Sequence, residues 1–223
     1  MEDYETDMMK FAGIKAVLFD FDLTLVDSSE GVIECANLTL SQMKMESVEY
    51  AMIRKTIGMT LENSFIFMTG IDDPDMSMEY KDRYIENAAG IITNKTKWMK
   101  GAKDVLIELR NKGIKTGIVS TKIKIRLLDF LDKENFTGMF DVIIGGDEVK
   151  KNKPDPEGLI LAMERLDLHK NEVLYVGDSL YDMDAAYNAE IAFAALLTGE
   201  TQREEFTDGK VNIFIKSLDQ LVN

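Results

Sequence analysis

The chain has 223 residues, of which 45% are apolar and 30% charged, a balance typical of globular proteins and not of disordered or membrane-embedded ones. Its length exceeds that of the usual single domain but falls short of two full-sized domains, so we expect one core with a modest insertion. The net charge of -14 argues against nucleic-acid binding, which requires a basic surface. An anionic ligand would need a few locally placed cations or a metal ion.

The N-terminal residues 1–7 are acidic and lack the basic flank and the apolar stretch of a secretory signal. We expect them to form a frayed tail. No apolar run reaches the roughly 18 residues that a membrane-spanning helix needs, so we expect no membrane partner. These features favour a cytoplasmic protein.

The first predicted strand covers residues 14–19, an apolar and β-rich run that stops at Asp20. A buried parallel strand that ends at a loop has this pattern. Residues 28–97 then show apolar residues at helical spacing with no strand between them. We therefore expect this segment to form a small all-helical cap domain inserted into the core. Its first helix is expected to be capped by the polar residues 27–29, and residues 72–74 (Asp-Asp-Pro) mark a break within it.

Strands and helices alternate after residue 98, and the turn at residues 112–113 ends the first helix of this part. Such alternation is typical of a Rossmann-like α/β core, an open and mostly parallel sheet with helices on both faces. We expect residues 1–27 and 98–223 to form it. Besides the helix that begins near residue 102, the predicted elements are strands over residues 116–119, 141–144, 173–176 and 191–197, and helices over residues 125–131, 157–166 and 181–189.

Polar residues follow the predicted strands, where an open parallel sheet binds its ligands. Alone, each segment has an ordinary structural explanation as a turn, a helix cap or a solvated lysine. Their conjunction favours one functional site. The segments are Asp20-Phe21-Asp22-Leu23-Thr24, Ser120-Thr121-Lys122, Lys153-Pro154-Asp155-Pro156 and Gly177-Asp178-Ser179-Leu180-Tyr181-Asp182.

This set of motifs resembles that of the haloacid dehalogenase superfamily, and within it the phosphatase branch with a small helical cap, most of all the phosphoglycolate phosphatases. The matching segments are spread over nearly the whole chain, at residues 20–28, 117–122, 153–156 and 177–182. Leu23 departs from the family, which commonly has glycine at this position. We expect the Leu23 backbone amide still to serve in binding the substrate.

The resemblance implies hydrolysis of a small phosphate monoester through a phosphoaspartyl intermediate on Asp20. A carboxylate in line with phosphorus can form such an acyl phosphate, which water then cleaves. Asp22 would act as acid and base. Ser120 would donate its hydroxyl to a phosphoryl oxygen, and Lys153 would offset the charge that spreads over these oxygens.

The resemblance also implies a Mg²⁺ ion, which prefers a few oxygen ligands and retains waters. Asp20, Asp178 and the main-chain carbonyl of Asp22 would bind it, and Asp182 would hold one of its waters.

Substrate contacts are expected from Leu23, Thr121 and Lys122 in the core and from Arg54 and Lys55 in the cap. Lys122 has an equally ordinary interpretation as a solvated lysine, and Arg54 and Lys55 as part of a polar helix face. The expected partner is a small phosphorylated metabolite. The sequence leaves its identity and the oligomeric state open.

Three other functions remain open. A phosphosugar mutase of the same superfamily would share every core residue and differ in the cap. Pyrophosphate is a further possible substrate, which would make the protein a pyrophosphatase. A catalytically inactive binding module would be expected to have lost Asp20, Asp22, Lys153 or Asp178, and all of these are present.

Overall fold

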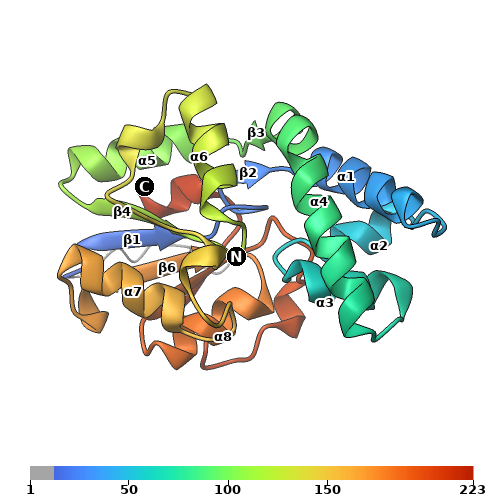
Figure 1. Ribbon diagram of the computed structural model, residues 1–223. Coiled ribbons are helices and arrows are strands. Elements are labelled where there is room, and N and C mark those ends of the chain that lie inside the picture. Colours follow the sequence, from blue (N-terminus) through green and yellow to red (C-terminus); the bar gives the residue numbers. More distant parts are fainter. Residues whose placement is uncertain (1–12, 223) are drawn as a thin grey trace.

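The protein is described by a computed structural model that covers residues 13–222 (Figure 1). The frayed tail expected at the N-terminus lies outside the described residues. The predicted α/β fold is confirmed: a six-stranded sheet has the order β5-β4-β1-β6-β7-β8, and its neighbouring strands all pair in parallel. The strands are β1 (Ala16–Phe19), β4 (Lys115–Val119), β5 (Val142–Ile144), β6 (Val173–Gly177), β7 (Ala192–Leu196) and β8 (Ile213–Ile215).

Helices cover both faces of this sheet (Figure 1). Side chains alternate between the faces along each strand, so Val17 and Phe19 of β1 join one apolar cluster while Ala16 and Leu18 join the other. The strand is buried throughout its length, which explains why its sequence is continuously apolar. The helices are α5 (Ala102–Asn111) and α6 (Lys124–Lys133) on one face, and α7 (Glu157–Leu166) and α8 (Leu180–Asn188) on the other.

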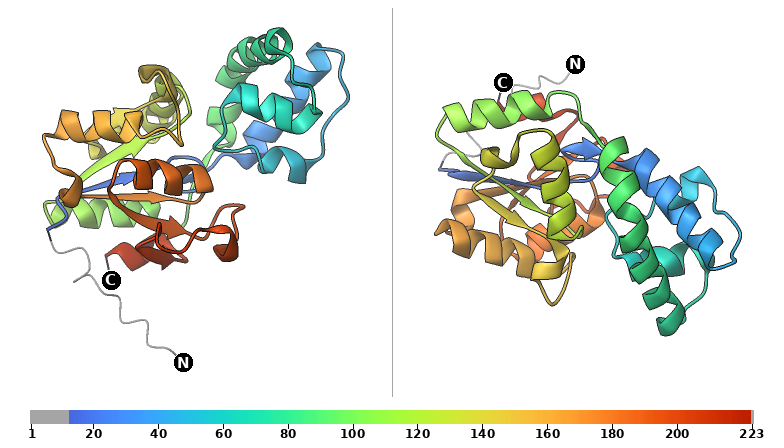
Figure 2. Two further views of the ribbon diagram at one scale, coloured as in Figure 1. Left: turned by 90° about the horizontal axis from the view of Figure 1, so that it is seen from below. Right: turned by 45° about the horizontal axis from the view of Figure 1, so that its top comes forward.

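An antiparallel pair of short strands, β2 (Val26–Asp27) and β3 (Lys97–Trp98), connects this core to a helical insertion. The insertion has its own buried apolar cluster and lies to one side of the sheet (Figure 2). Sequence patterns predicted the helices but not the two-residue strands that join them to the core. The helices of the insertion are α1 (Ser29–Gln42), α2 (Tyr50–Arg54), α3 (Leu61–Thr69) and α4 (Pro74–Lys95).

The predicted break before α4 is confirmed and has a local cause. Asp73 caps the helix, because its carboxylate accepts hydrogen bonds from the amides of Asp75 and Met76 at 2.9 and 3.0 Å, and Pro74 is the first helical residue. The cap expected at α1 is different. Ser28 stands at the N-cap position but makes no side-chain cap bond; its hydroxyl donates to Asp22 Oδ1 instead.

Within the described residues, none of the helices combines the length and the apolar character that crossing a lipid bilayer demands.

Close packing of α1 on α4 leads to a prediction about stability. A methyl group added to Gly31 in α1 would lie 2.8 Å from Ile92 Cα in α4, so the helices would have to separate. We expect Gly31→Ala to lower the free energy of unfolding by about 1–3 kcal/mol, measured by urea denaturation. Gly90→Ala in α4 is the matched control, since it meets no atom within 4 Å and should stabilise the helix by about 0.5–1 kcal/mol. Equal effects of both substitutions would contradict the packing argument.

Candidate active site

The order of the sheet brings the polar segments together. β1 lies between β4 and β6, and the carboxyl ends of parallel strands meet at one edge of a sheet. Asp20 follows β1, Ser120 follows β4 and Asp178 follows β6. All three are buried, at the edge where open parallel sheets bind their ligands.

Asp20, Asp178 and Asp182 form a buried carboxylate cluster. Each offers an oxygen, and these oxygens all lie within 4.8 Å of one another. The Lys153 ammonium contacts two of them, at 2.8 Å from Asp20 Oδ1 and 2.5 Å from Asp182 Oδ1. Because one ammonium faces three carboxylates, the cluster keeps an excess of negative charge whenever all three are ionised.

The proton affinities of these groups reflect that excess. Burial raises the pKa of the Asp20 carboxyl to about 7; Lys153 lowers it and Asp182 raises it further. Burial, Asp182 and Asp20 together raise the pKa of Asp178 well above its usual range. Burial alone would lower the pKa of Lys153, but Asp182 and Asp20 outweigh it and raise the pKa. The lysine therefore stays charged, and two of the carboxyls resist ionisation.

The donor set of the cluster fits a hard divalent cation. Carboxylate oxygens are the ligands that such ions prefer, and a bound ion would neutralise the charge that Lys153 leaves uncompensated. In the described part of the chain, these residues form the one group of acidic, histidine or cysteine side chains close enough to hold a metal ion.

Two supporting residues were missed by sequence reasoning. The Tyr175 hydroxyl lies 3.0 Å from Lys153 Nζ and 2.9 Å from Asp182 Oδ1. Thr24 Oγ1 donates to Asp178 Oδ1 at 2.8 Å. Two features of the sequence could have pointed to them: Tyr175 is a polar-tipped residue within the otherwise apolar strand β6, and Thr24 is the last residue of the first motif.

The Asp22 side chain has its own partners outside the cluster. Its Oδ1 accepts hydrogen bonds from Ser28 Oγ at 2.5 Å and from Lys122 Nζ at 2.9 Å. Lys122 is thus held within the site and is not a solvated lysine. Its Nζ also lies 5.6 Å from the centre of the Phe21 ring.

Ser120 lies beside this pair, and its Oγ accepts a hydrogen bond from the Lys122 amide at 3.2 Å. That contact leaves the hydroxyl hydrogen available for a ligand.

The Leu23 amide, expected to bind the substrate, is engaged within the turn of the first motif. Leu23 has a φ of 61°, a left-handed conformation that glycine adopts without strain. Its N–H donates to the Val26 carbonyl at 2.7 Å, so the amide is occupied within the turn. Its own carbonyl accepts a hydrogen bond from Thr198 Oγ1 at 2.7 Å. The residue therefore shapes the loop in this structure, and a contact of its amide with a substrate stays a prediction.

The expected substrate contacts of the insertion lie at its junction with the core. The Arg54 guanidinium pairs with Glu200 of the core and donates to Ser29 Oγ at 2.8 Å. Thr121 Oγ1 donates to the Gly58 carbonyl at 3.2 Å. Lys55 is exposed. The structure thus ties Arg54 and Thr121 into contacts between the insertion and the core.

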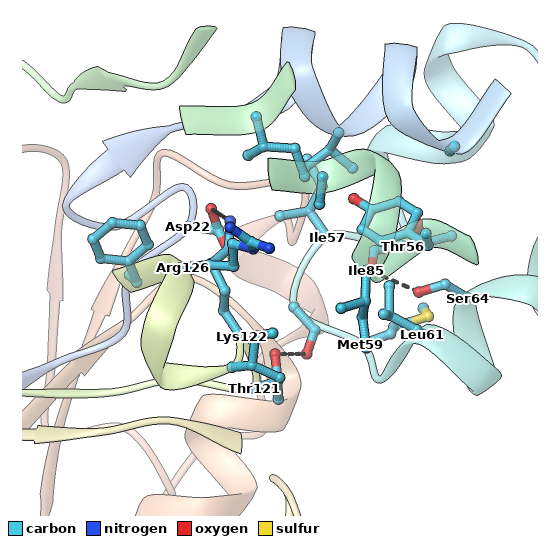
Figure 3. Close-up of a pocket in the computed structure, with 18 of the residues that line it drawn as sticks. Asp22, Thr56, Ile57, Met59, Leu61, Ser64, Ile85, Thr121, Lys122 and Arg126 are labelled. Atoms are coloured by element: carbon cyan, nitrogen blue, oxygen red, sulfur yellow. Dashed lines mark hydrogen bonds and ion pairs between the residues drawn. The ribbon is translucent and has the colours of Figure 1, made fainter. Parts of the chain in front are cut away.

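A cavity of about 110 Å³ lies between the core and the insertion, and Asp22, Thr121 and Lys122 contribute to its wall on the core side (Figure 3). The insertion contributes mainly apolar side chains, among them Ile57 and Ile85. The site therefore has a charged part at the sheet edge and an adjoining apolar part beneath the helices.

The known proteins that this chain resembles include two phosphate-cleaving enzymes and a hydrolase of solved structure. The chain is 28% identical over 186 residues to a phosphoglycolate phosphatase of Yersinia pestis, covering 82% of this chain and 80% of that protein. It is 27% identical over 210 residues to the pyrophosphatase PpaX of Listeria welshimeri, covering 94% and 95%. A crystal structure of a haloacid dehalogenase-like hydrolase from Bacteroides fragilis superimposes with a TM-score of 0.90 and 39% identity, over 93% of this chain and 99% of that one.

The family model described as haloacid dehalogenase-like hydrolase matches residues 17–196, a range that includes the carboxylate cluster, Lys153 and the whole insertion. The resemblance seen in the sequence motifs is thereby confirmed, and the chain belongs to the haloacid dehalogenase-like hydrolase family.

Proposed function

We propose that the protein is a magnesium-dependent phosphatase that cleaves a small phosphate monoester through a phosphoaspartyl intermediate on Asp20. The observation that carries the proposal is the buried cluster of Asp20, Asp178 and Asp182 with a single ammonium, that of Lys153, in contact. The similarity to a phosphoglycolate phosphatase and to a pyrophosphatase supports a phosphorylated substrate.

In this proposal Asp20 attacks phosphorus and forms an acyl phosphate. Lys153, 2.8 Å from Asp20 Oδ1, orients the nucleophile and offsets negative charge on the phosphoryl oxygens, while the Ser120 hydroxyl donates to one of them. Mg²⁺ held by Asp20, Asp178 and the Asp22 carbonyl, with Asp182 holding one of its waters, would supply further charge neutralisation.

Asp22 protonates the leaving oxygen and later takes a proton from the attacking water. Ser28 and Lys122 hold its carboxyl group by hydrogen bonds, which fixes its direction. Positioning of this kind is a large part of what phosphoryl transfer requires of a protein.

We further propose that residues 28–97 act as a cap domain over a core of residues 1–27 and 98–223. The β2–β3 pair is the covalent junction of the two parts. Movement about this junction would admit the substrate and then exclude water during the reaction.

Pyrophosphate hydrolysis is the second candidate. It is favoured by the similarity to PpaX, which extends over 94% of this chain. Comparing hydrolysis of pyrophosphate, phosphoglycolate, sugar phosphates and nucleotides, with and without Mg²⁺, decides between the two.

The charge excess in the cluster predicts that Asp178→Asn stabilises the metal-free protein near neutral pH. Asp20 has a pKa raised from 3.8 to about 7, and the pKa of Asp178 is also raised, so the folded protein holds protons that the unfolded chain releases. The stability that this provides is fully present below about pH 4 and is lost as the pH rises towards about 7. Removing one carboxylate should therefore raise the Tm at about pH 7.5, by about 2–4 °C for each kcal/mol, and have little effect at about pH 4.

Thermal unfolding with a chelator, at several pH values, checks this expectation. Added Mg²⁺ should raise the Tm of the wild type and raise that of Asp178→Asn much less. A variant that is less stable than the wild type at every pH would contradict the charge argument.

The acid and base role predicts that Asp22→Asn lowers turnover by about 100-fold or more. An aryl phosphate needs little protonation on departure, so the variant should still be phosphorylated and then stall. Mass spectrometry of the quenched protein should find the added phosphoryl group on Asp20. Wild-type turnover, or a label on another residue, would refute the assignment.

The contact of Arg54 with Glu200 predicts a role in closing the insertion onto the core. We expect Arg54→Ala to raise KM for small phosphate esters more than it lowers kcat, because the closed arrangement loses an ion pair. Arg83→Ala is the matched control, since Arg83 pairs with Glu79 within α4. Steady-state kinetics on the substrate panel measure both, and equal effects of the two substitutions would count against this role.

A further inference from the structure

The ammonium of Lys153 stands at the end of a long and flexible side chain, yet it is held at one place in the site. Lys153 lies in the loop before α7, and fixing such a side chain costs much of its rotamer freedom. Two of its contacts are with Asp20 and Asp182. In the proposed function both carboxylates have another task, since one attacks phosphorus and the other holds a metal-bound water. Neither contact therefore serves only to hold the ammonium.

Tyr175 supplies the third contact. Its Oη accepts a hydrogen bond from Lys153 Nζ at 3.0 Å, and Nζ lies 5.7 Å from the centre of the tyrosine ring. An ammonium has three N–H donors and no acceptor, so the two carboxylates and this hydroxyl match its donors one to one. Tyr175 is the neutral partner among the three.

The Tyr175 ring is fixed by the sheet. It belongs to β6, which lies between β1 and β7, and its side chain is completely buried. The ring joins the apolar cluster that packs beneath α7 and α8, with its centre 6.1 Å from that of the Phe193 ring. Close packing of this kind leaves few rotamers open to a side chain. The hydroxyl is therefore a fixed point in the site.

The same hydroxyl joins several segments of the chain. Its single hydrogen has two acceptors within reach, the Val119 carbonyl at 3.0 Å and Asp182 Oδ1 at 2.9 Å. Val119 ends β4 immediately before Ser120, and Asp182 lies on α8. One oxygen atom thus contacts the end of β4, the lysine loop and the first turn of α8.

We infer that Tyr175 is a positioning residue, whose hydroxyl holds the Lys153 ammonium in the direction of Asp20. The inference rests on the proposed function, in which Lys153 orients the nucleophile and offsets charge on the phosphoryl oxygens. Tyr175 acts only through the lysine and its neighbours, because its hydroxyl is fully buried beneath them. Without the hydroxyl, one N–H of the ammonium has no partner and the side chain is free to turn.

Tyr175→Phe tests the inference, because it keeps the ring and removes the hydroxyl. With Mg²⁺ and an aryl phosphate, we expect kcat to fall about 10-fold or more, the effect of losing one hydrogen bond to a charged group. KM should stay within about threefold, since the contacts that bind the substrate remain. Steady-state kinetics measure both values.

Thr116→Val is the matched control. Thr116 is a buried residue of β4 whose hydroxyl donates to the Met139 carbonyl, as that of Tyr175 donates to the Val119 carbonyl. Each variant loses one buried hydroxyl, so both should lower the Tm by a similar amount. Only Tyr175→Phe should lower kcat. An equal fall of kcat in both variants would assign the effect to stability and overturn the positioning role.

A double-mutant cycle with Lys153→Met asks whether the tyrosine acts through the lysine. Tyr175→Phe should slow phosphorylation of Asp20 about 10-fold in the wild type and less than about twofold in Lys153→Met, followed by mass spectrometry in a single turnover. A purely structural effect would give the same factor in both backgrounds. Lys153→Arg, which keeps the charge but not the ammonium, takes the place of Lys153→Met if that variant does not fold; if neither folds, the comparison with Thr116→Val decides.

The outcomes separate the inference from the function on which it rests. If the wild type hydrolyses the aryl phosphate in a Mg²⁺-dependent way and Tyr175→Phe keeps its kcat, or loses the same factor in both backgrounds, the role of Tyr175 is refuted and the proposed function stands. If the wild type shows neither hydrolysis nor a phosphoryl label on Asp20, the proposed function is refuted as well.

Discussion

Three carboxylates are buried within reach of one another at the edge of the sheet, and a single ammonium, that of Lys153, contacts two of them. Burying a charge is costly unless it is paired and hydrogen-bonded, so this arrangement constrains everything around it. Tyr175, Thr24 and Ser179 supply hydrogen bonds to the carboxylates. These hydrogen bonds do not neutralise the negative charge that exceeds the charge of Lys153, and a bound cation would do so. A site of this kind trades stability for function, and the strands beneath it must be well packed to hold it together.

The sheet holds these groups by bringing together residues that are distant in the sequence. Asp20 and Lys153 are separated by 133 positions and Thr24 and Asp178 by 154, yet each pair is in contact because the segments follow neighbouring strands or lie beside them. β1 in the middle of the sheet is buried on both faces, which gives Asp20 at its end a rigid base. The apolar helices of the insertion line the same cavity as Asp22 and Lys122 of the core.

The spacing of apolar residues in the sequence predicted the strands and helices, because these depend on local periodicity. The apolar runs of β1, β4 and β6 and the helical spacing of α7 located those elements, and the polar residues after the strands located the cluster. What the sequence could not show depends on contacts formed after folding. Ser28 is a residue type that often caps helices, but its hydroxyl donates to Asp22. The Leu23 amide donates to the Val26 carbonyl.

The β2–β3 pair has a consequence for how the insertion can change. Because Val26 faces Trp98 and Asp27 faces Lys97, the chain leaves the core and returns to it at adjacent points. For the folding of the core, the insertion is therefore a loop whose two ends are held together. The entropy of closing such a loop grows only with the logarithm of its length, about 0.6 kcal/mol for each doubling. The segment between these strands could therefore lengthen, shorten or be replaced with little change in the folding free energy of the sheet. The same core could then carry insertions of many different shapes.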